Sequence, residues 1–277
     1  MISKIIANVI LALVLSLIAF LVLFPLYFVL STSLKSYKTY IKNPYGIDFG
    51  HLAFKNYSEV LMRKNILDSM LNSVWVSGFS VICTVLWTAL TSFGIGVVKF
   101  KGHGILYIIA ISTMFFSGEM VYLPLYLMYS KMNLLGRFSV LLIPSVISLS
   151  GLGIIMGSGF AKLIPIELHE AAFLDGAKLK HVFLKIDLPM LVPVLSMVAI
   201  MQFQASWSDF FWPLITVIGN PKAQTLPLMI VGYRASDVMY FGQYCAGLTI
   251  MTIPIVIVYC FCSKYFMQGM AVGAIKG

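Results

Sequence analysis

The sequence predicts an all-α membrane protein that crosses the bilayer six times, with one amphipathic loop outside the membrane. The 277 residues are 60% hydrophobic and only 10% charged, with a mean hydropathy of +0.95. A soluble domain carries about 25% charged residues. At roughly 20 apolar residues per span, the length allows about five to seven spans and leaves no room for a separate soluble domain.

Six apolar runs divide the chain, which we treat as one membrane domain over residues 1–277. The expected spans are residues 5–30, 70–98, 105–128, 138–160, 189–211 and 243–261. The first run follows Lys4 and is longer than a signal-peptide core, with no small-residue cleavage site after it, so we expect it to be retained. The remaining segments are loops, apart from a C-terminal tail at 263–277.

Small and hydroxyl-bearing residues mark the second and fourth spans. The hydroxyl residues of the second span are Ser77, Ser80, Thr84, Thr88, Thr91 and Ser92. Such a set favours helix–helix packing, and the wall of a solute pathway is the alternative. In the fourth span Gly153 and Gly157 stand four residues apart, which predicts the close approach of a neighbouring helix.

The longest polar interruption in the second half of the chain is residues 161–188. Pro165 suits the first turn of a helix, and Glu167 and Glu170 suit its positive end. Asp175-Gly176 then ends that helix, with glycine as the stop and aspartate as the cap of the next helix. The next helix has an apolar face and a polar face, formed by Leu179, Val182, Phe183 and Ile186 and by Lys178, His181 and Lys185. We therefore expect two short amphipathic helices outside the bilayer, with one side free for a partner.

The spacing within this loop resembles the EAA loop of ABC importer permeases. The matching positions are Glu170, Ala171, Ala172, Asp175, Gly176, Ala177, Phe183, Ile186, Leu188 and Pro189. An ordinary loop is the alternative, but this many matches, correctly placed between two apolar spans, make the pattern specific. The whole chain resembles carbohydrate-uptake permeases of the maltose-transport type. Its length and its Gly273–Gly277 ending resemble the smaller of the two permease subunits.

This resemblance implies a transport assembly rather than an enzyme. The chain would pair with a second, larger permease subunit, two cytoplasmic ATPase subunits and an extracytoplasmic solute-binding protein that delivers a carbohydrate. ATP and Mg would bind the ATPase, so the chain itself would hold no cofactor. The loop and both termini would lie in the cytoplasm, with the spans in the cell membrane of a bacterium.

The resemblance also assigns roles within the loop, which would dock as a coupling helix in a cleft of the ATPase. Glu170 and Asp175 would make polar or capping contacts there. Ala171 and Ala172 would allow close approach, and Gly176 would supply the turn.

The remaining coupling positions would attach the loop to the membrane part. Phe183 and Leu188 would fix it to the rest of the permease, and Ala177 and Pro189 complete the pattern. In the tail, Gly273, Lys276 and Gly277 are candidate contacts with the ATPase.

Polar and aromatic residues of the spans are candidates for a solute pathway: Asn72, Glu119, Gln204, Trp207, Asp209 and Phe210. A carboxylate within a span usually faces the protein interior or a water-filled cavity, although Glu119 can also reach the interface. Trp207 lies roughly 27 Å along the helix from Pro189. An aromatic anchor at the membrane interface is therefore the favoured interpretation of Trp207 and Trp212, with a platform for a sugar ring as the alternative.

The net charge and the motifs of the sequence argue against other classes of protein. The net charge of +9 suits anionic headgroups and does not argue for nucleic acid. No Gly-Lys dipeptide is present, so the chain has no Walker A loop. No catalytic constellation stands out, and the histidines and cysteines lack metal-ligand spacing, so we expect no metal site. Lys and Arg number nine on one side and ten on the other, so the positive-inside rule does not orient the chain.

Two alternatives remain open on these residues. A secondary, ion-coupled carrier or a non-transporting scaffold is the competing class, although we see no internal repeat of the kind that many carriers show. For the solute, an oligosaccharide is the first expectation, and a non-sugar solute such as a glycerol phosphate ester is the second.

Overall fold

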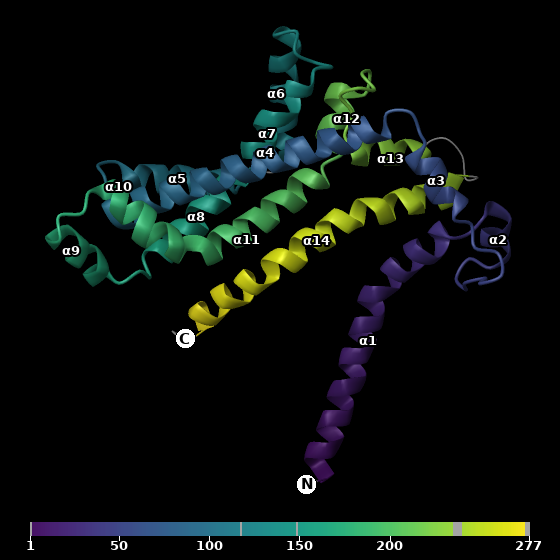
Figure 1. Cartoon of the computed structure of the whole chain (residues 1–277), viewed down its shortest axis with the longest axis horizontal. Helices are drawn as coiled ribbons and strands as arrows, with labels where there is room; N and C mark the ends of the chain where they lie inside the picture. The colour runs from purple at the N-terminus through teal and green to yellow at the C-terminus, as the bar shows by residue number, and fades with distance from the viewer. Residues whose placement is uncertain (1, 117, 148, 235–239, 275–277) are drawn as a thin grey trace. The chain divides into compact units, whose positions relative to one another are not determined.

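The computed structural model describes residues 2–116, 118–147, 149–234 and 240–274, which form helices and connecting turns without a strand (Figure 1). The side chains of residues 2–5, 119, 234 and 263–274 are outside this description. The chain divides into two compact units. Unit 1 comprises Met1–Ile66 and Met229–Ile253, and unit 2 comprises Leu67–Leu228 and Pro254–Gly277. The all-α fold expected from composition is confirmed.

Unit 1 contains one long apolar helix and a polar loop region. Its helices are α1 (Ile2–Ser33), α2 (Tyr37–Lys42) and α3 (Lys55–Leu61), most of α13 (Leu226–Arg234) and the first part of α14 (Phe241–Ala274). The side chains of residues 6–27 in α1 are exposed on all sides. A helix that is apolar all round is stable when its solvent is lipid.

The loop region of unit 1 is organised by buried polar side chains. Lys35 is 2% exposed and its Nζ donates to the Pro44 carbonyl at 2.6 Å. Asn56 Nδ2 donates to the carbonyls of Ser33 and Lys35 at 2.8 and 2.9 Å. Burial lowers the pKa of Lys35, because a low-dielectric site disfavours the charged ammonium. These bonds satisfy backbone groups of a segment that lacks a regular helix.

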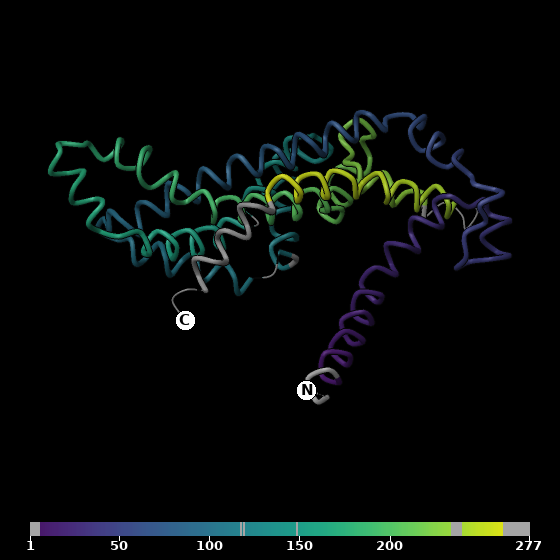
Figure 2. Tube along the Cα trace, turned by 60° about the horizontal axis from the view of Figure 1, so that its bottom comes forward, coloured from purple at the N-terminus to yellow at the C-terminus, as the bar shows by residue number. Residues whose placement is uncertain are grey.

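Unit 2 carries the remaining helices and most of the apolar core. They are α4 (Ile66–Ser92), the π-helix η1 (Phe93–Val98), α5 (His103–Thr113), α6 (Gly118–Lys131), the 3-10 helix η2 (Phe138–Leu141), α7 (Leu142–Ile147), α8 (Ser150–Ala161), α9 (Ile166–Leu174), α10 (Leu179–Val182), the π-helix η3 (Phe183–Asp187), α11 (Leu188–Trp207), α12 (Phe211–Val217) and the end of α14. Helix α8 packs against α5, α11 and η1. Figure 2 shows the chain turning back between α8 and α11 at one end of this unit.

The hydroxyl side chains of α4 are packing groups, as their spacing predicts. Ser77, Ser80, Thr84, Thr88 and Ser92 are all fully buried, whereas Thr91 is half-buried. A Cβ added at Gly153 would overlap the Thr88 hydroxyl, and one added at Gly157 would overlap that of Ser92. The two glycines therefore let the backbone of α8 lie directly against side chains of α4. The prediction of close packing is confirmed.

Five described helical segments are long and apolar enough to cross a membrane. They are Ile6–Ser33, Ile66–Val98, Phe138–Ala161, Leu179–Trp207 and Phe241–Cys262. The span expected at 105–128 is instead divided into α5 and α6, of 11 and 14 residues. Gly118 begins α6, and glycine favours an interruption because it loses the most backbone entropy in a helix. The expected count of six spans is therefore not confirmed among the described residues.

Within the span expected at 138–160, α7 is described to Ile147, and Leu149 is the N-cap of α8. Side chains of two other helices bond carbonyls in the last turn of α7. Gln202 Nε2 donates to the Ser145 carbonyl at 2.6 Å, and Thr84 Oγ1 donates to the Val146 carbonyl at 3.2 Å. Irregular backbone at membrane depth is tolerated where protein groups satisfy it in this way.

The tryptophans expected at the membrane interface are core residues instead. Trp207 and Trp212 are each 1% exposed. The ring of Trp207 stacks on Phe203 at a centroid distance of 5.4 Å, and Trp212 Nε1 donates to the Val140 carbonyl at 2.9 Å. The interface-anchor interpretation is wrong, because helix spacing locates a residue along the axis but does not tell which face its neighbours cover.

Candidate functional site

The candidate site is the loop at 161–188, which α9 opens. Pro165 is the N-cap of α9 and Glu167 lies in its first turn. The helix ends at Leu174, and Gly176 follows its C-cap with a φ of +79°, the left-handed conformation that glycine tolerates best. The amides of Gly176 and Ala177 donate to the carbonyls of Phe173 and Ala172, at 3.0 and 2.9 Å. These two bonds form a Schellman motif, so the predicted glycine stop is confirmed.

The second helix of the loop differs from the prediction at both ends. Asp175 is the C-cap of α9 and not the cap of the next helix, since Lys178 precedes α10. Helix α10 then continues through η3 into α11 without a break, so the expected start of a new span at Pro189 is absent. The wide π turn of η3 accommodates Pro189, which lacks an N–H and would clash with the carbonyl four residues earlier in a regular helix.

The inward side of the loop attaches it to the membrane helices. Val182 is fully buried, and Phe183 and Leu188 pack against an apolar cluster that includes Ala161 and Leu191. The ring of Phe183 also lies 5.1 Å from that of Phe93, centroid to centroid. Both residues thus occupy the anchoring position that the resemblance implies, although their role in coupling stays a prediction.

A buried histidine–aspartate pair joins the two helical parts of the loop. His169 Nε2 lies 3.0 Å from Asp187 Oδ1, and their side chains are 7% and 0% exposed. Sequence reasoning missed this pair and regarded His169 as one of four scattered histidines. The only available signal was a histidine and an aspartate at opposite ends of one amphipathic loop.

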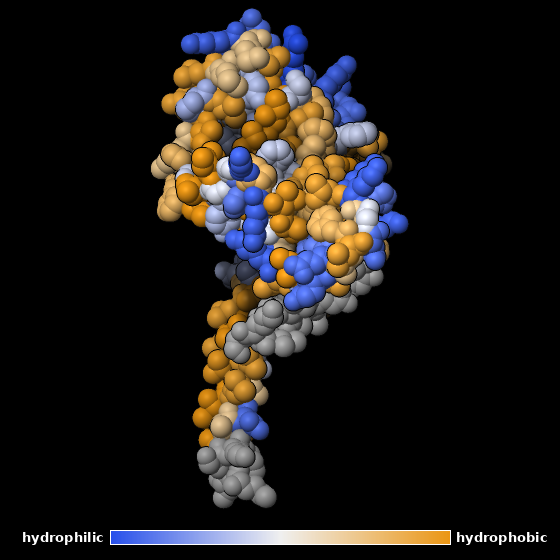
Figure 3. Space-filling view, turned by 90° about the vertical axis from the view of Figure 1, so that its left-hand side faces the viewer, coloured by the Kyte–Doolittle hydropathy of each residue, from blue (hydrophilic) through white to orange (hydrophobic). Residues whose placement is uncertain are grey.

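The outward side of the loop is mixed polar and apolar. Glu170, Ala171, Asp175 and Gly176 are exposed, and Ala172 and Ala177 are half-buried. Large apolar side chains are exposed among them: Leu168, Phe173, Leu174, Leu179 and Leu184. Leu174 is 89% exposed. The end of unit 2 that carries α9 and α10 accordingly shows hydrophilic and hydrophobic residues side by side (Figure 3). We call this exposed side of residues 166–184 the docking face.

Three pathway candidates lie near α12 and have local structural contacts. Asn72 Nδ2 donates to the carbonyls of Lys222 and Gln224 at 2.8 and 2.9 Å. Asp209 Oδ1 accepts from the Trp212 amide at 3.3 Å, at the start of α12. Phe210 is 37% exposed. Asn72 and Asp209 thus hold loop and helix ends in this structure.

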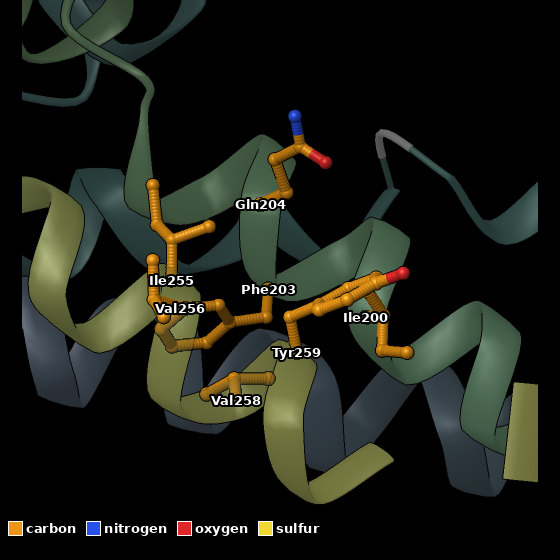
Figure 4. Close-up of a pocket in the computed structure, with 7 residues that line it drawn as sticks. All are labelled: Ile200, Phe203, Gln204, Ile255, Val256, Val258 and Tyr259. Atoms are coloured by element: carbon orange, nitrogen blue, oxygen red, sulfur yellow. The ribbon is translucent and has the colours of Figure 1, made fainter. Parts of the chain in front are cut away.

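The other pathway candidates have different surroundings. Trp207 is buried in this structure, and its place in a solute pathway stays a prediction. Gln204 is exposed and lines a shallow pocket with Ile200, Phe203, Ile255, Val256, Val258 and Tyr259. Figure 4 shows the amide of Gln204 pointing away from these mainly apolar side chains. The side chain of Glu119 lies outside the described residues.

The predicted tail contacts are only partly within the described chain. Helix α14 runs to Ala274, so Gly273 belongs to its last turn, whereas Lys276 and Gly277 lie outside the described residues. Among the side chains that the structure describes, no group of three or more His, Cys, Asp or Glu residues could hold a metal ion.

Comparison with solved structures shows which fold the chain shares. No family model matches the chain. The crystal structure of a bacterial ABC transporter involved in the import of the acidic polysaccharide alginate matches with a TM-score of 0.82 at 21% identity, over 95% of this chain and 98% of that one. A second crystal structure, of a bacterial alginate ABC transporter in complex with an alginate pentasaccharide-bound periplasmic protein, matches with a TM-score of 0.70 at 16% identity, over 94% and 93%. The fold is therefore that of an ABC transporter membrane subunit.

Curated relatives establish the family. The probable ABC transporter permease protein YurM of Bacillus subtilis is 30% identical over 215 residues, covering 78% of this chain and 71% of the relative. The arabinooligosaccharides transport system permease protein AraQ of Halalkalibacterium halodurans is 29% identical over 206 residues, covering 74% and 73%. The chain belongs to the ABC transporter permease family. It is a transport subunit of a bacterial membrane and not an enzyme.

Proposed function

We propose that the chain is the smaller permease subunit of an ABC importer that takes up an oligosaccharide. The single observation that carries this proposal is the extended match to permeases whose names specify oligosaccharide transport. The two similar structures support the same solute class, since both come from transporters of a polysaccharide. An ABC permease for a non-sugar solute such as a glycerol phosphate ester remains the second candidate.

The docking face supports ATP-driven coupling. Its exposed leucines and Phe173 lie in the polar interruption between two spans, where water would meet them. Covering apolar surface gains about 25 cal/mol per Å², and an isolated membrane subunit cannot cover this face by itself. The chain has no phosphate-binding loop of its own. An ATPase subunit that binds here would supply the missing nucleotide site.

The contacts within this interface follow from exposure and side-chain size. Glu170 and Asp175 are exposed acidic groups that would pair with donors of the ATPase. Ala171 and Ala172 are small enough for a close approach, and Gly176 fixes the turn. An ATPase bound here would put residues 161–188 in the cytoplasm, because nucleotide is available there. With six spans, both termini would lie on the same side as this loop.

Other parts of the chain would complete the transporter. A second, larger permease subunit would pair with this one, two ATPase subunits would bind ATP and Mg, and an extracytoplasmic binding protein would deliver the carbohydrate. The tail residues Gly273, Lys276 and Gly277 would reach the ATPase. The candidates for the solute pathway remain Asn72, Glu119, Gln204, Trp207, Asp209 and Phe210.

The mechanism is an alternating opening of the helix bundle. Closure of the ATPase subunits around ATP would move the docking face, and the continuous α10–η3–α11 segment would carry that movement into the membrane. Hydrolysis would return the bundle to its inward-facing state. Packed assemblies with two stable arrangements can amplify small shifts in this manner.

Uptake by cells provides the test. We expect a strain lacking this chain to lose import of labelled oligosaccharides, and the unmodified chain to restore it only when ATP is available. The Glu170→Lys variant should insert in the membrane without restoring uptake, whereas Asp68→Lys, at an exposed acidic residue outside the docking face, should restore it. Uptake that survives ATP depletion would indicate an ion-coupled carrier, and uptake of glycerol phosphate esters alone would reassign the solute.

A further inference from the structure

We propose that the His169–Asp187 pair is a positioning contact that sets the orientation of α9 relative to α11. The inference rests on the proposed function, because it makes this pair the link between the ATPase-binding helix and the membrane helix. Neither residue touches nucleotide or solute in this role. The pair acts by holding the docking face at one angle.

The first argument is how weakly α9 is otherwise held. Of its nine residues, only His169 is buried. The Schellman motif fixes where α9 ends but leaves its rotation about the following turn free. A helix in this situation needs a specific tertiary contact to keep one orientation.

The second argument is the place of Asp187 in the fold. It is the last residue of η3, directly before α11 begins at Leu188. The 3.0 Å contact therefore joins the middle of α9 to the base of the long membrane helix, and bypasses the turn at residues 175–178. A movement of α9 would reach α11 through this contact as well as through the backbone.

The third argument is energetic. Asp187 is fully buried, and its Oδ2 has no hydrogen-bond partner among the described residues. A buried carboxylate with one oxygen unpaired is less favourable than an apolar residue of similar size. The hydrogen bond from His169 Nε2 to Oδ1 offsets part of that cost and is directional. An apolar side chain at the same place would pack without specifying an angle.

A distance measurement on the purified full-length chain tests the pair without any partner. Spin labels at Leu174→Cys in α9 and Met201→Cys in α11 would be used in a background where the four native cysteines are replaced, in lipid nanodiscs. We expect one narrow distance distribution for the parent. His169→Phe keeps the ring volume but removes the donor, and should reduce the fraction in that peak by about fivefold or more. Asp187→Asn retains an acceptor and should keep the parent distribution.

A double-mutant comparison and a matched control complete the experiment. The His169→Phe, Asp187→Leu double variant should broaden the distribution no more than either single change, because the pair is one interaction. His181→Ala changes an exposed histidine of the same loop and should have no effect. A parent-like distribution in His169→Phe, or additive broadening in the double variant, would overturn the proposal.

The reconstituted transporter gives a second measurement. Its value would not change in the variants if the pair had only a structural role. We expect His169→Phe to lower solute imported per ATP hydrolysed by about fivefold or more, with ATP hydrolysis itself retained and with Asp187→Asn close to the parent. An unchanged ratio would contradict the positioning role. If the parent imported solute without ATP, the proposed function would fail, whereas the distance measurement would still decide whether the pair orients α9.

Discussion

The α4–α8 interface and the docking face distribute polar and apolar residues in opposite ways. Between α4 and α8, serine and threonine hydroxyls are fully buried against glycines. On the docking face, leucines and a phenylalanine are exposed beside charged groups. In a bilayer the apolar solvent does not drive helices together, so small polar residues build the interface. Outside the bilayer, exposed apolar residues are typical of a surface that another protein covers, which is the role we propose for the docking face.

The largest effect is expected at the α4–α8 interface. Gly157→Val would drive a side chain into the Ser92 hydroxyl and Thr88, and overpacking of a filled interior costs about 1–3 kcal/mol. We expect a clear loss of thermal stability, measured by size-exclusion chromatography after heating in detergent. Gly159→Val is the matched control, because a Cβ there meets nothing within 4 Å. Equal stability of the two variants would contradict the packing argument.

Substitutions in the turn of the docking face should reduce uptake without lowering the stability of the protein. Gly176→Pro cannot adopt a φ of +79° and removes the amide that bonds Phe173. We expect uptake to be abolished while the protein remains inserted at normal levels. Gly176→Asn should retain most uptake, since asparagine tolerates the left-handed conformation. Normal uptake in the proline variant would remove the turn from the coupling mechanism.

A single exposed leucine offers a smaller and more selective test. Leu174→Asp should leave stability within about 0.5 kcal/mol of the parent, because an exposed surface position is tolerant. Co-purification of the ATPase should nevertheless fall, since the apolar contact would be replaced by a charge. The control is Phe49→Asp, at a residue that is 80% exposed in unit 1. If both variants retained the ATPase equally, the docking face would lie elsewhere.

The smallest effect is expected at the C-terminus. Removal of residues 271–277 takes away the tail contacts but leaves the docking face intact. We expect ATPase co-purification to weaken less than in Leu174→Asp, with uptake reduced in proportion. An unchanged pull-down would exclude the tail from the interface.

Several parts of the fold and site were accessible from residue patterns. Gly153 and Gly157, spaced one helical turn apart, predicted the close packing of α8, and Gly176 predicted the end of α9. The interruption between α5 and α6 was not predicted, because mean apolarity over 105–128 does not distinguish one helix from two. The continuity of α10 with α11 was also missed. A proline such as Pro189 usually indicates the start of a helix, and the sequence does not show that a π turn precedes it.

The sequence by itself determined the class of fold, the place of the docking face and its glycine turn, because hydropathy and local backbone preferences act over a few neighbouring residues. Only the tertiary structure decided which polar groups are buried together. Trp212 met Val140 across 72 positions, and His169 met Asp187 across 18 positions. Such contacts depend on how separate helices pack, and no local pattern contains that information.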